Sequence, residues 1–166
     1  MTPRIGDVVY LCYSERSVAA SVGFQIYDAN VRAGRVEMKA SPEDGLTLTV
    51  EGVMGELAFA KLFNLYPPVA VLLRGDLPKF DTLLHDGRRV DVKTTRRPGG
   101  KMYVARHKGD TAGVDLYALM TGEPPGPWTY RGAMTRADLI VPGRIQVPIP
   151  GKPAYVALQR ELREIG

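Results

Sequence analysis

Apolar residues along the chain follow two different periods, and these periods predict both helices and strands. Residues 18–33 carry apolar side chains at roughly helical spacing, and residues 51–64 are apolar on nearly every side of a helix. A turn cluster at residues 41–45 precedes residues 46–50, where apolar and polar positions alternate as in a strand. Thr49 is the expected cap of the second helix.

Short apolar runs in the rest of the chain predict further strands. They occupy residues 69–73, 80–84, 90–95, 102–106, 116–120 and 128–134. A short helix is expected to start at 135–138, and the proline-rich tail is typical of loops and short strands. This order predicts an α+β fold resembling an α/β sandwich, with flanking helices around one central sheet that is mixed or mostly antiparallel.

Composition is that of a single globular domain. The chain has 166 residues, of which 45% are hydrophobic and 24% charged, so we expect one domain over residues 1–166 with its core at about 51–140. No apolar run reaches the length of a membrane span, and no signal peptide is evident, which predicts a cytoplasmic protein without membrane partners. For a phage-encoded protein, this is the host cytoplasm. The single Cys12 excludes an internal disulfide and is expected to be a buried thiol.

A charged pair alternates with two valines in the most informative strand. Val90 and Val92 have the period of a half-buried strand, so Asp91 and Lys93 share its other face. Taken alone, such a pair is also typical of a surface salt bridge. A further carboxylate, Asp81, stands in the preceding strand, across a polar turn.

The length of that turn decides whether the two carboxylates meet. A turn of two residues would direct Asp81 to the side of the valines, whereas a turn of three residues at 85–87 places Asp81 opposite Asp91. The longer turn also puts Phe80 and Leu84 on the side of the valines, which makes one consistent apolar face. We therefore expect the three-residue turn, because only this register gathers both the acids and the apolar residues.

Glu56 is a third carboxylate, placed within the nearly all-apolar helix. On a helical wheel it lies on the arc of Phe59, Phe63 and Ala60, and the small Gly55 precedes it in the sequence. A carboxylate in such surroundings is costly unless a cation or a hydrogen-bond donor meets it. The alternative is a glutamate at the edge of the apolar arc that reaches solvent or pairs with an arginine.

Three segments of the chain resemble the motifs of the PD-(D/E)XK nuclease superfamily, which has the restriction-endonuclease-like fold. They are Gly55-Glu56-Leu57-Ala58, Phe80-Asp81 and Asp91-Val92-Lys93, and the resemblance covers about residues 51–120. It implies a core of a helix, a β-hairpin with a third strand, another helix and a further strand. It also implies the site residues: two metal-binding acids, Asp81 and Asp91, the catalytic lysine, Lys93, and the helix glutamate, Glu56.

The first acid is where the chain departs from that pattern. Phe80 stands where the family has proline, with Pro78 close by. Asp76 is a rival for the role of Asp81, which we prefer because it adjoins the predicted strand.

Together these residues predict an enzyme, a Mg²⁺-dependent nuclease that hydrolyses phosphodiester bonds in DNA, with Mn²⁺ expected to substitute. Asp81 and Asp91 would hold the metal, with the Val92 carbonyl as a further ligand and Glu56 binding directly or through water. Lys93 would position and help to activate the attacking water.

Positive charge is concentrated beside these residues. The chain has a net charge of +4, and its cations crowd between residues 88 and 108, where the one acid is Asp91. We expect five of these cations to bind the phosphate backbone of DNA: Arg88, Arg89, Arg96, Arg97 and Lys101.

Two other interpretations remain open. The chain could be a nuclease-fold protein that binds nucleic acid or a protein partner without cutting, or a metal-free protein whose charged residues form salt bridges. A homodimer also remains open.

Overall fold

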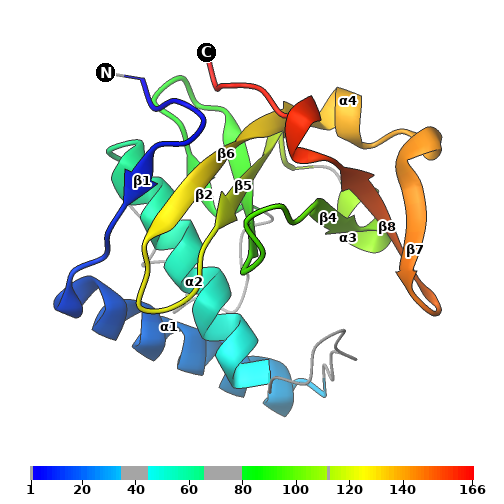
Figure 1. Cartoon of the computed structure of the whole chain (residues 1–166). Coiled ribbons are helices and arrows are strands. Elements are labelled where there is room, and N and C mark those ends of the chain that lie inside the picture. The colour runs from blue at the N-terminus through cyan, green and yellow to red at the C-terminus, as the bar shows by residue number, and fades with distance from the viewer. Residues whose placement is uncertain (1, 35–44, 66–79, 112) are drawn as a thin grey trace.

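The computed structural model describes residues 2–34, 45–65, 80–111 and 113–166. The expected strand at 69–73, Asp76 and Pro78 lie outside these ranges. The chain has helices and sheets in three layers, which confirms the α+β class: two helices, then a five-stranded sheet, then a three-stranded sheet (Figure 1). None of the described helices is both long and apolar enough to cross a bilayer.

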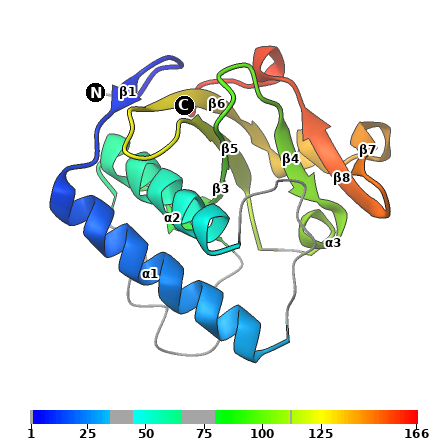
Figure 2. The same cartoon turned by 60° about the horizontal axis from the view of Figure 1, so that its bottom comes forward.

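α2 (Gly45–Leu62) packs on one face of the larger sheet, and α1 (Tyr13–Arg32) packs against α2 (Figure 2). The expected strand at 46–50 is wrong, because α2 already begins at Gly45. Val50 packs closely on Gly23 of α1: a Cβ atom added to Gly23 would lie 2.8 Å from the Cα atom of Val50. Thr49 is inside the helix, where its hydroxyl donates to the Gly45 carbonyl over 2.6 Å, so it is not the cap. Tertiary packing therefore overrides the local alternation.

The larger sheet is mixed, as expected, and has the strand order β1-β6-β5-β3-β2. Its strands are β1 (Val8–Val9), β2 (Thr82–Leu83), β3 (Arg89–Thr95), β5 (Leu116–Thr121) and β6 (Trp128–Thr135). β3 and β5 are parallel, and the other neighbours are antiparallel. β5 is therefore central and β2 is an edge strand that covers only the beginning of β3.

A second sheet, which the sequence did not predict, is built largely from the tail. It has the order β4-β8-β7, formed by β4 (Met102–Ala105), β7 (Ile145–Ile149) and β8 (Lys152–Ala157). β4 was expected to be the third strand of a single sheet, and that expectation is wrong. Short helices complete the chain: α3 (Arg106–Gly109), α4 (Arg136–Leu139), η2 (Pro142–Arg144) and η3 (Gln159–Glu161).

Two apolar clusters separate the three layers. Side chains of α2 such as Phe59 meet Val90 and Val92 of β3 in the first cluster. The second cluster lies between the two sheets and includes Tyr117 and Met102. All residues of β5 are buried, because neighbouring positions along this strand supply the two clusters alternately.

Cys12 was expected to be buried, and this is wrong. It is exposed at the N-terminus of α1, where its backbone N–H donates to Glu15 over 2.6 Å. The thiol lies 3.1 Å from the Ser14 hydroxyl.

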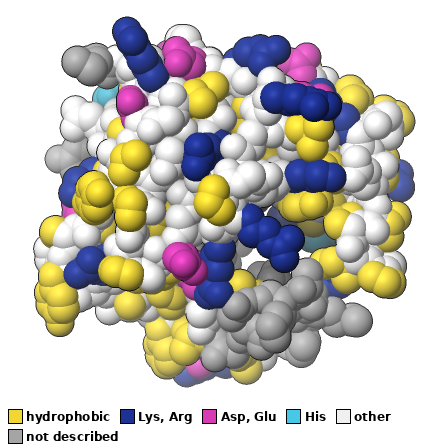
Figure 3. All heavy atoms as spheres, in the orientation of Figure 1, with side chains coloured by type: hydrophobic (Ala, Val, Ile, Leu, Met, Phe, Trp, Pro, Cys, Tyr) yellow, Lys and Arg dark blue, Asp and Glu magenta, His cyan; other side chains and the backbone are white. Residues whose placement is uncertain are grey.

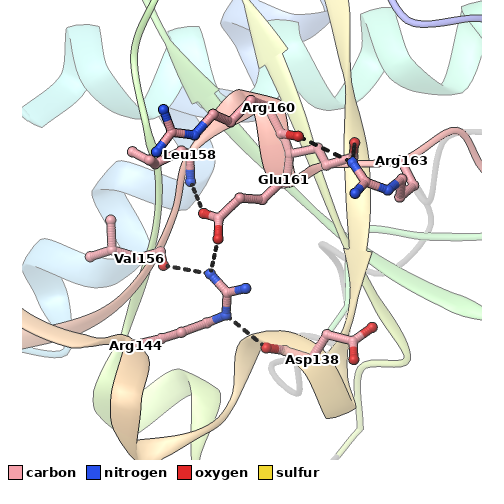
Figure 4. Close-up of polar contacts among 8 residues, drawn as sticks. Asp138, Arg144, Val156, Leu158, Arg160, Glu161 and Arg163 are labelled. Carbon is pink, nitrogen blue, oxygen red and sulfur yellow. Dashed lines mark hydrogen bonds and ion pairs between the residues drawn. The ribbon is translucent and has the colours of Figure 1, made fainter.

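The guanidinium of Arg144 ties the C-terminal segment to the second sheet (Figure 4). It donates to the Asp138 carbonyl over 2.8 Å, to the Val156 carbonyl over 3.4 Å and to the Glu161 carboxylate over 3.1 Å. Glu161 in turn accepts from the Leu158 backbone N–H over 2.7 Å. One side chain therefore connects α4, β8 and η3.

Replacing Arg144 with alanine is expected to lower the free energy of unfolding by about 1–3 kcal/mol, because a carboxylate and two carbonyls lose a donor. Urea unfolding at neutral pH measures the loss. Arg160→Ala is the matched control, since this exposed arginine of the same segment should change stability by less than about 0.5 kcal/mol. If the two variants lose equal free energy of unfolding, the hydrogen bonds of Arg144 do not stabilise this part of the fold.

Candidate functional site: an acidic cluster at the edge of β3

The hairpin has the register expected from the sequence. Thr82 pairs with Val90 and Leu83 with Arg89, so the same register places Asp81 opposite Asp91. The hydrogen bond from the Leu84 N–H to the Arg88 carbonyl, 2.9 Å long, encloses the three-residue turn.

Only one of the two apolar residues expected beside the valines lies there. Leu84 joins Val90 and Val92 in the first cluster, as expected. Phe80 packs against the second cluster, so its expected placement is wrong. The reason is that β2 begins at Thr82, so Phe80 precedes the strand and does not follow its alternation.

Asp81 lies beside β3, just before β2 begins. Its backbone N–H donates to the Val90 carbonyl over 2.8 Å, and its carboxylate accepts from the Val92 N–H over 2.7 Å. The side chain therefore continues the ladder beyond the end of β2. Since the N–H and C=O groups of one strand residue point the same way, the Val92 carbonyl faces this side of β3 too.

Asp91 and Lys93 form an ion pair on the face of β3 that is turned toward the second sheet. The ammonium lies 2.6 Å from one carboxylate oxygen and 2.7 Å from the other. The side chains are 14% and 22% exposed respectively, so this is no solvated surface pair. Tyr117 and Leu119 are their neighbours across the parallel ladder.

Glu56 approaches the same strand from α2. The adjacent Gly55 packs so tightly that an added Cβ atom would lie 2.0 Å from a methyl carbon of Thr94. This close approach brings the helix onto β3. Burial raises the pKa of Glu56 to about 7; the charge of Asp91 adds to this rise, and those of Lys93 and Lys108 oppose it.

The four charged groups act on one another. Burial raises the pKa of Asp81 well above its usual value, and the charges of Glu56 and Asp91 raise it further. Burial alone would lower the pKa of Lys93, but Asp91, Asp81 and Glu56 together hold it above its usual value. The structure therefore brings all four predicted residues close enough for their charges to act on one another, with Asp91 and Lys93 in direct contact.

The donor atoms of this cluster fit a hard divalent cation. Within the described residues no three His, Cys, Asp or Glu side chains group closely enough for one ion. Mg²⁺, however, is usually bound by one or two carboxylates, with water and substrate phosphate as the other ligands. Asp81, Asp91 and the Val92 carbonyl are oxygen donors of this kind. Glu56 is near enough to Asp91 and Lys93 for their charges to act on its pKa.

Three of the arginines expected to bind DNA are engaged within the protein. Arg88 contacts Asp86 over 2.6 Å, and Arg89 binds both carboxylate oxygens of Asp115 over 2.9 Å. Arg89 thereby holds the pKa of Asp115 well below its usual range. Arg96 forms an ion pair with Glu51, which is buried in α2.

Arg97 and Lys101 are exposed in the turn between β3 and β4 and form no ion pair with a described residue. The Gln159 amide fixes this turn, because it donates to the Pro98 carbonyl over 2.7 Å and to the Gly100 carbonyl over 2.8 Å. Figure 3 shows Lys and Arg side chains beside a hollow near the centre of the face that it draws.

Lys108 and Tyr117 belong to the site, although sequence reasoning did not select them. Lys108, exposed on α3, acts on Glu56. The Tyr117 hydroxyl is buried, and its pKa is raised by burial and by the charge of Asp91, while the nearby Arg136 opposes the rise. The crowding of basic residues up to position 108 was the one available signal for Lys108, and none existed for Tyr117.

Comparison with known proteins gives a family and nothing beyond it. No curated protein and no solved structure matches the chain. Residues 3–122 match the model of a protein family described as "Family of unknown function (DUF5843)". That range includes Glu56, Asp81, Asp91 and Lys93, and it covers more than half of the sequence. The chain therefore belongs to the family of unknown function DUF5843.

Proposed function

We propose that the protein is a Mg²⁺-dependent nuclease with a restriction-endonuclease-like core, and that DNA is its substrate. The observation that carries the proposal is the hairpin register, which sets Asp81 opposite Asp91. Glu56 and the ion-paired Lys93 complete the set that the PD-(D/E)XK resemblance implies.

Asp81 and Asp91 would hold the cation together with the Val92 carbonyl, and Mn²⁺ would replace Mg²⁺. When bound, the ion polarises the scissile phosphate and stabilises its developing charge. Asp81 is already oriented for this role, because the Val92 N–H fixes one of its carboxylate oxygens.

Lys93 acts in this proposal as a hydrogen-bond donor and a positive charge. Its raised pKa keeps the ammonium protonated at neutral pH, so it orients the attacking water and offsets charge on the phosphate. Glu56, with a pKa of about 7, is suited to accept a proton from that water. The two residues thereby divide the work of positioning and proton transfer.

The exposed turn supplies the binding surface for the phosphate backbone. Arg97 and Lys101 have no competing ion pair among the described residues. Arg88, Arg89 and Arg96 would each have to leave an internal carboxylate before they could bind phosphate. We therefore assign the larger share of backbone contacts to the turn.

The proposed activity is tested by incubating the protein with supercoiled, linear, branched and single-stranded DNA. Cleavage is expected with Mg²⁺ or Mn²⁺ and none with EDTA. Asp91→Asn should remove the activity, because it removes one charged ligand. Absence of cleavage from every substrate with either metal, in folded protein, would contradict the proposal. DNA binding in that case would favour the non-catalytic interpretation.

A second prediction separates the exposed from the engaged cations. Replacing Arg97 and Lys101 with alanine together should weaken DNA binding, and the log–log salt slope should fall by roughly 0.9 per lost contact on duplex. Arg88→Ala is the control, since its guanidinium already contacts Asp86. Gel shift in Ca²⁺ at several salt concentrations measures both. An equal loss for the control would show that engaged arginines rearrange to bind DNA.

A further inference from the structure

An apolar stripe runs along the outside of α1. Among the described elements, α1 lies on the far side of α2 from the larger sheet (Figure 2). Its Ala19, Val22 and Ile26 belong to the first cluster or pack against it. The stripe lies on another side of the helix, and its residues are spaced alternately four and three positions apart. They are Tyr13, Ser17, Ala20, Phe24, Tyr27 and Val31.

This spacing is that of a helix–helix seam, where contact residues recur every 3.5 positions on average. Its large side chains face solvent: Tyr13 is 80% exposed, Phe24 56% and Val31 55%. Ser17 and Ala20 are exposed too, and Tyr27 is half-buried. Exposed apolar side chains that recur along one side of a helix are typical of an interaction surface.

The order of large and small residues along the stripe is complementary to its own reverse. When a second copy of α1 packs antiparallel on the first, each stripe residue meets the residue of the second copy whose number gives 44 when the two are added. The resulting layers are Tyr13 with Val31, Ser17 with Tyr27 and Ala20 with Phe24. Each layer joins a smaller side chain to a larger one. Because the pair has two-fold symmetry, every layer occurs twice in it.

The charges beside the stripe permit this pairing. Arg16 lies on one flank and Asp28 on the other. In an antiparallel pair each flank meets the same flank of the second copy. Arg16 then faces the neighbourhood of Asn30, and Asp28 that of Ser14, so no like charges meet.

The available area is sufficient for a specific contact. At 80% and 56% exposure, Tyr13 and Phe24 together offer roughly 250 Å² per copy. With the other four positions, two copies would bury roughly 1,000 Å², the lower limit for a specific interface.

We propose that α1 is the interface of an antiparallel homodimer in which the stripe from Tyr13 to Val31 packs against its own copy. This inference does not depend on the proposed nuclease activity. Sedimentation equilibrium of the full chain, from micromolar to hundred-micromolar concentration, should show a dimer. A monomer throughout that range overturns the proposal.

Phe24→Arg should weaken dimerisation more than about 100-fold, since the symmetry removes an aromatic contact from two layers. Val18→Arg is the matched control, because Val18 is 46% exposed on the same helix. It lies about 140° around the helix from Tyr13, away from the stripe. Both variants should keep the wild-type circular dichroism spectrum, which shows that each still folds. Equal weakening by the two substitutions would overturn the interface.

Disulfide cross-linking tests the direction of the two helices. In a Cys12→Ser background, a chain carrying Tyr13→Cys and Val31→Cys should form covalent dimers under mild oxidation. Tyr13→Cys alone should not, because an antiparallel pair holds the two copies of position 13 about 27 Å apart. Cross-linking of the single variant as readily as the double variant would exclude the antiparallel arrangement.

Discussion

Lys93→Ala is expected to abolish DNA cleavage while DNA affinity stays nearly unchanged. The ammonium is held 2.6 Å from Asp91 in a largely buried position, where its raised pKa keeps it charged at neutral pH. Removal of one preorganised donor of this kind typically costs about 10²–10³ in rate. One cation among several is a small part of the binding surface, so affinity should fall little.

Lys101→Ala is the matched control for this substitution. Lys101 is exposed on the β3–β4 turn and forms no ion pair with a described residue, so its loss should weaken binding and spare the rate at saturating DNA. Cleavage in Mg²⁺ and gel shift in Ca²⁺ separate the two effects. Should Lys93→Ala cut as fast as the wild type, the nuclease assignment for this motif is wrong, and binding without catalysis takes its place.

The hairpin could be predicted from the sequence because its register depends on local information. Alternation of Val90 and Val92 with charged residues permits only one turn length that buries the valines and joins the acids. Glu56 was predictable for a similar reason, since a carboxylate on an apolar helix needs a compensating group.

The errors arise where long-range contacts decide the structure. Residues 46–50 alternate like a strand, yet packing against α1 makes them helical. β4 leaves the main sheet because β8, about fifty residues later in the chain, supplies its partner. The partners of Arg89 and Arg96 are Asp115 and Glu51, and no local pattern in the sequence indicates either pair.

Glu56→Gln is expected to stabilise the metal-free protein at pH 8 by about 1–3 kcal/mol. In the folded protein, burial and the charge of Asp91 raise the pKa of Glu56 from 4.5 to about 7. Between these pH values the folded state binds more protons than the unfolded state, so the stability of the wild type falls as pH rises. Glutamine has nearly the same shape and cannot ionise, so it removes this loss.

The gain should therefore depend on pH. Below about pH 4.5 Glu56 is protonated in both states, and the variant and the wild type should differ little. Urea unfolding in EDTA at pH 4 and pH 8 measures the two limits. A variant less stable than the wild type at pH 8 would mean that neighbouring cations fully compensate the Glu56 charge.

Glu51→Gln is the matched control on the same helix, and its effect should have the opposite sign. Glu51 is 8% exposed and its carboxylate forms an ion pair with Arg96, so the substitution removes a charge that the guanidinium compensates.

A cation that neutralises the cluster around Glu56 should also stabilise the wild type, by an amount that grows with the concentration of the cation. Millimolar Mg²⁺ at pH 8 is expected to raise the melting temperature of the wild type, and Asp91→Asn should remove this increase. If neither Mg²⁺ nor Mn²⁺ changes the melting temperature of the wild type, the acidic cluster does not bind these metals, even if Glu56→Gln behaves as expected.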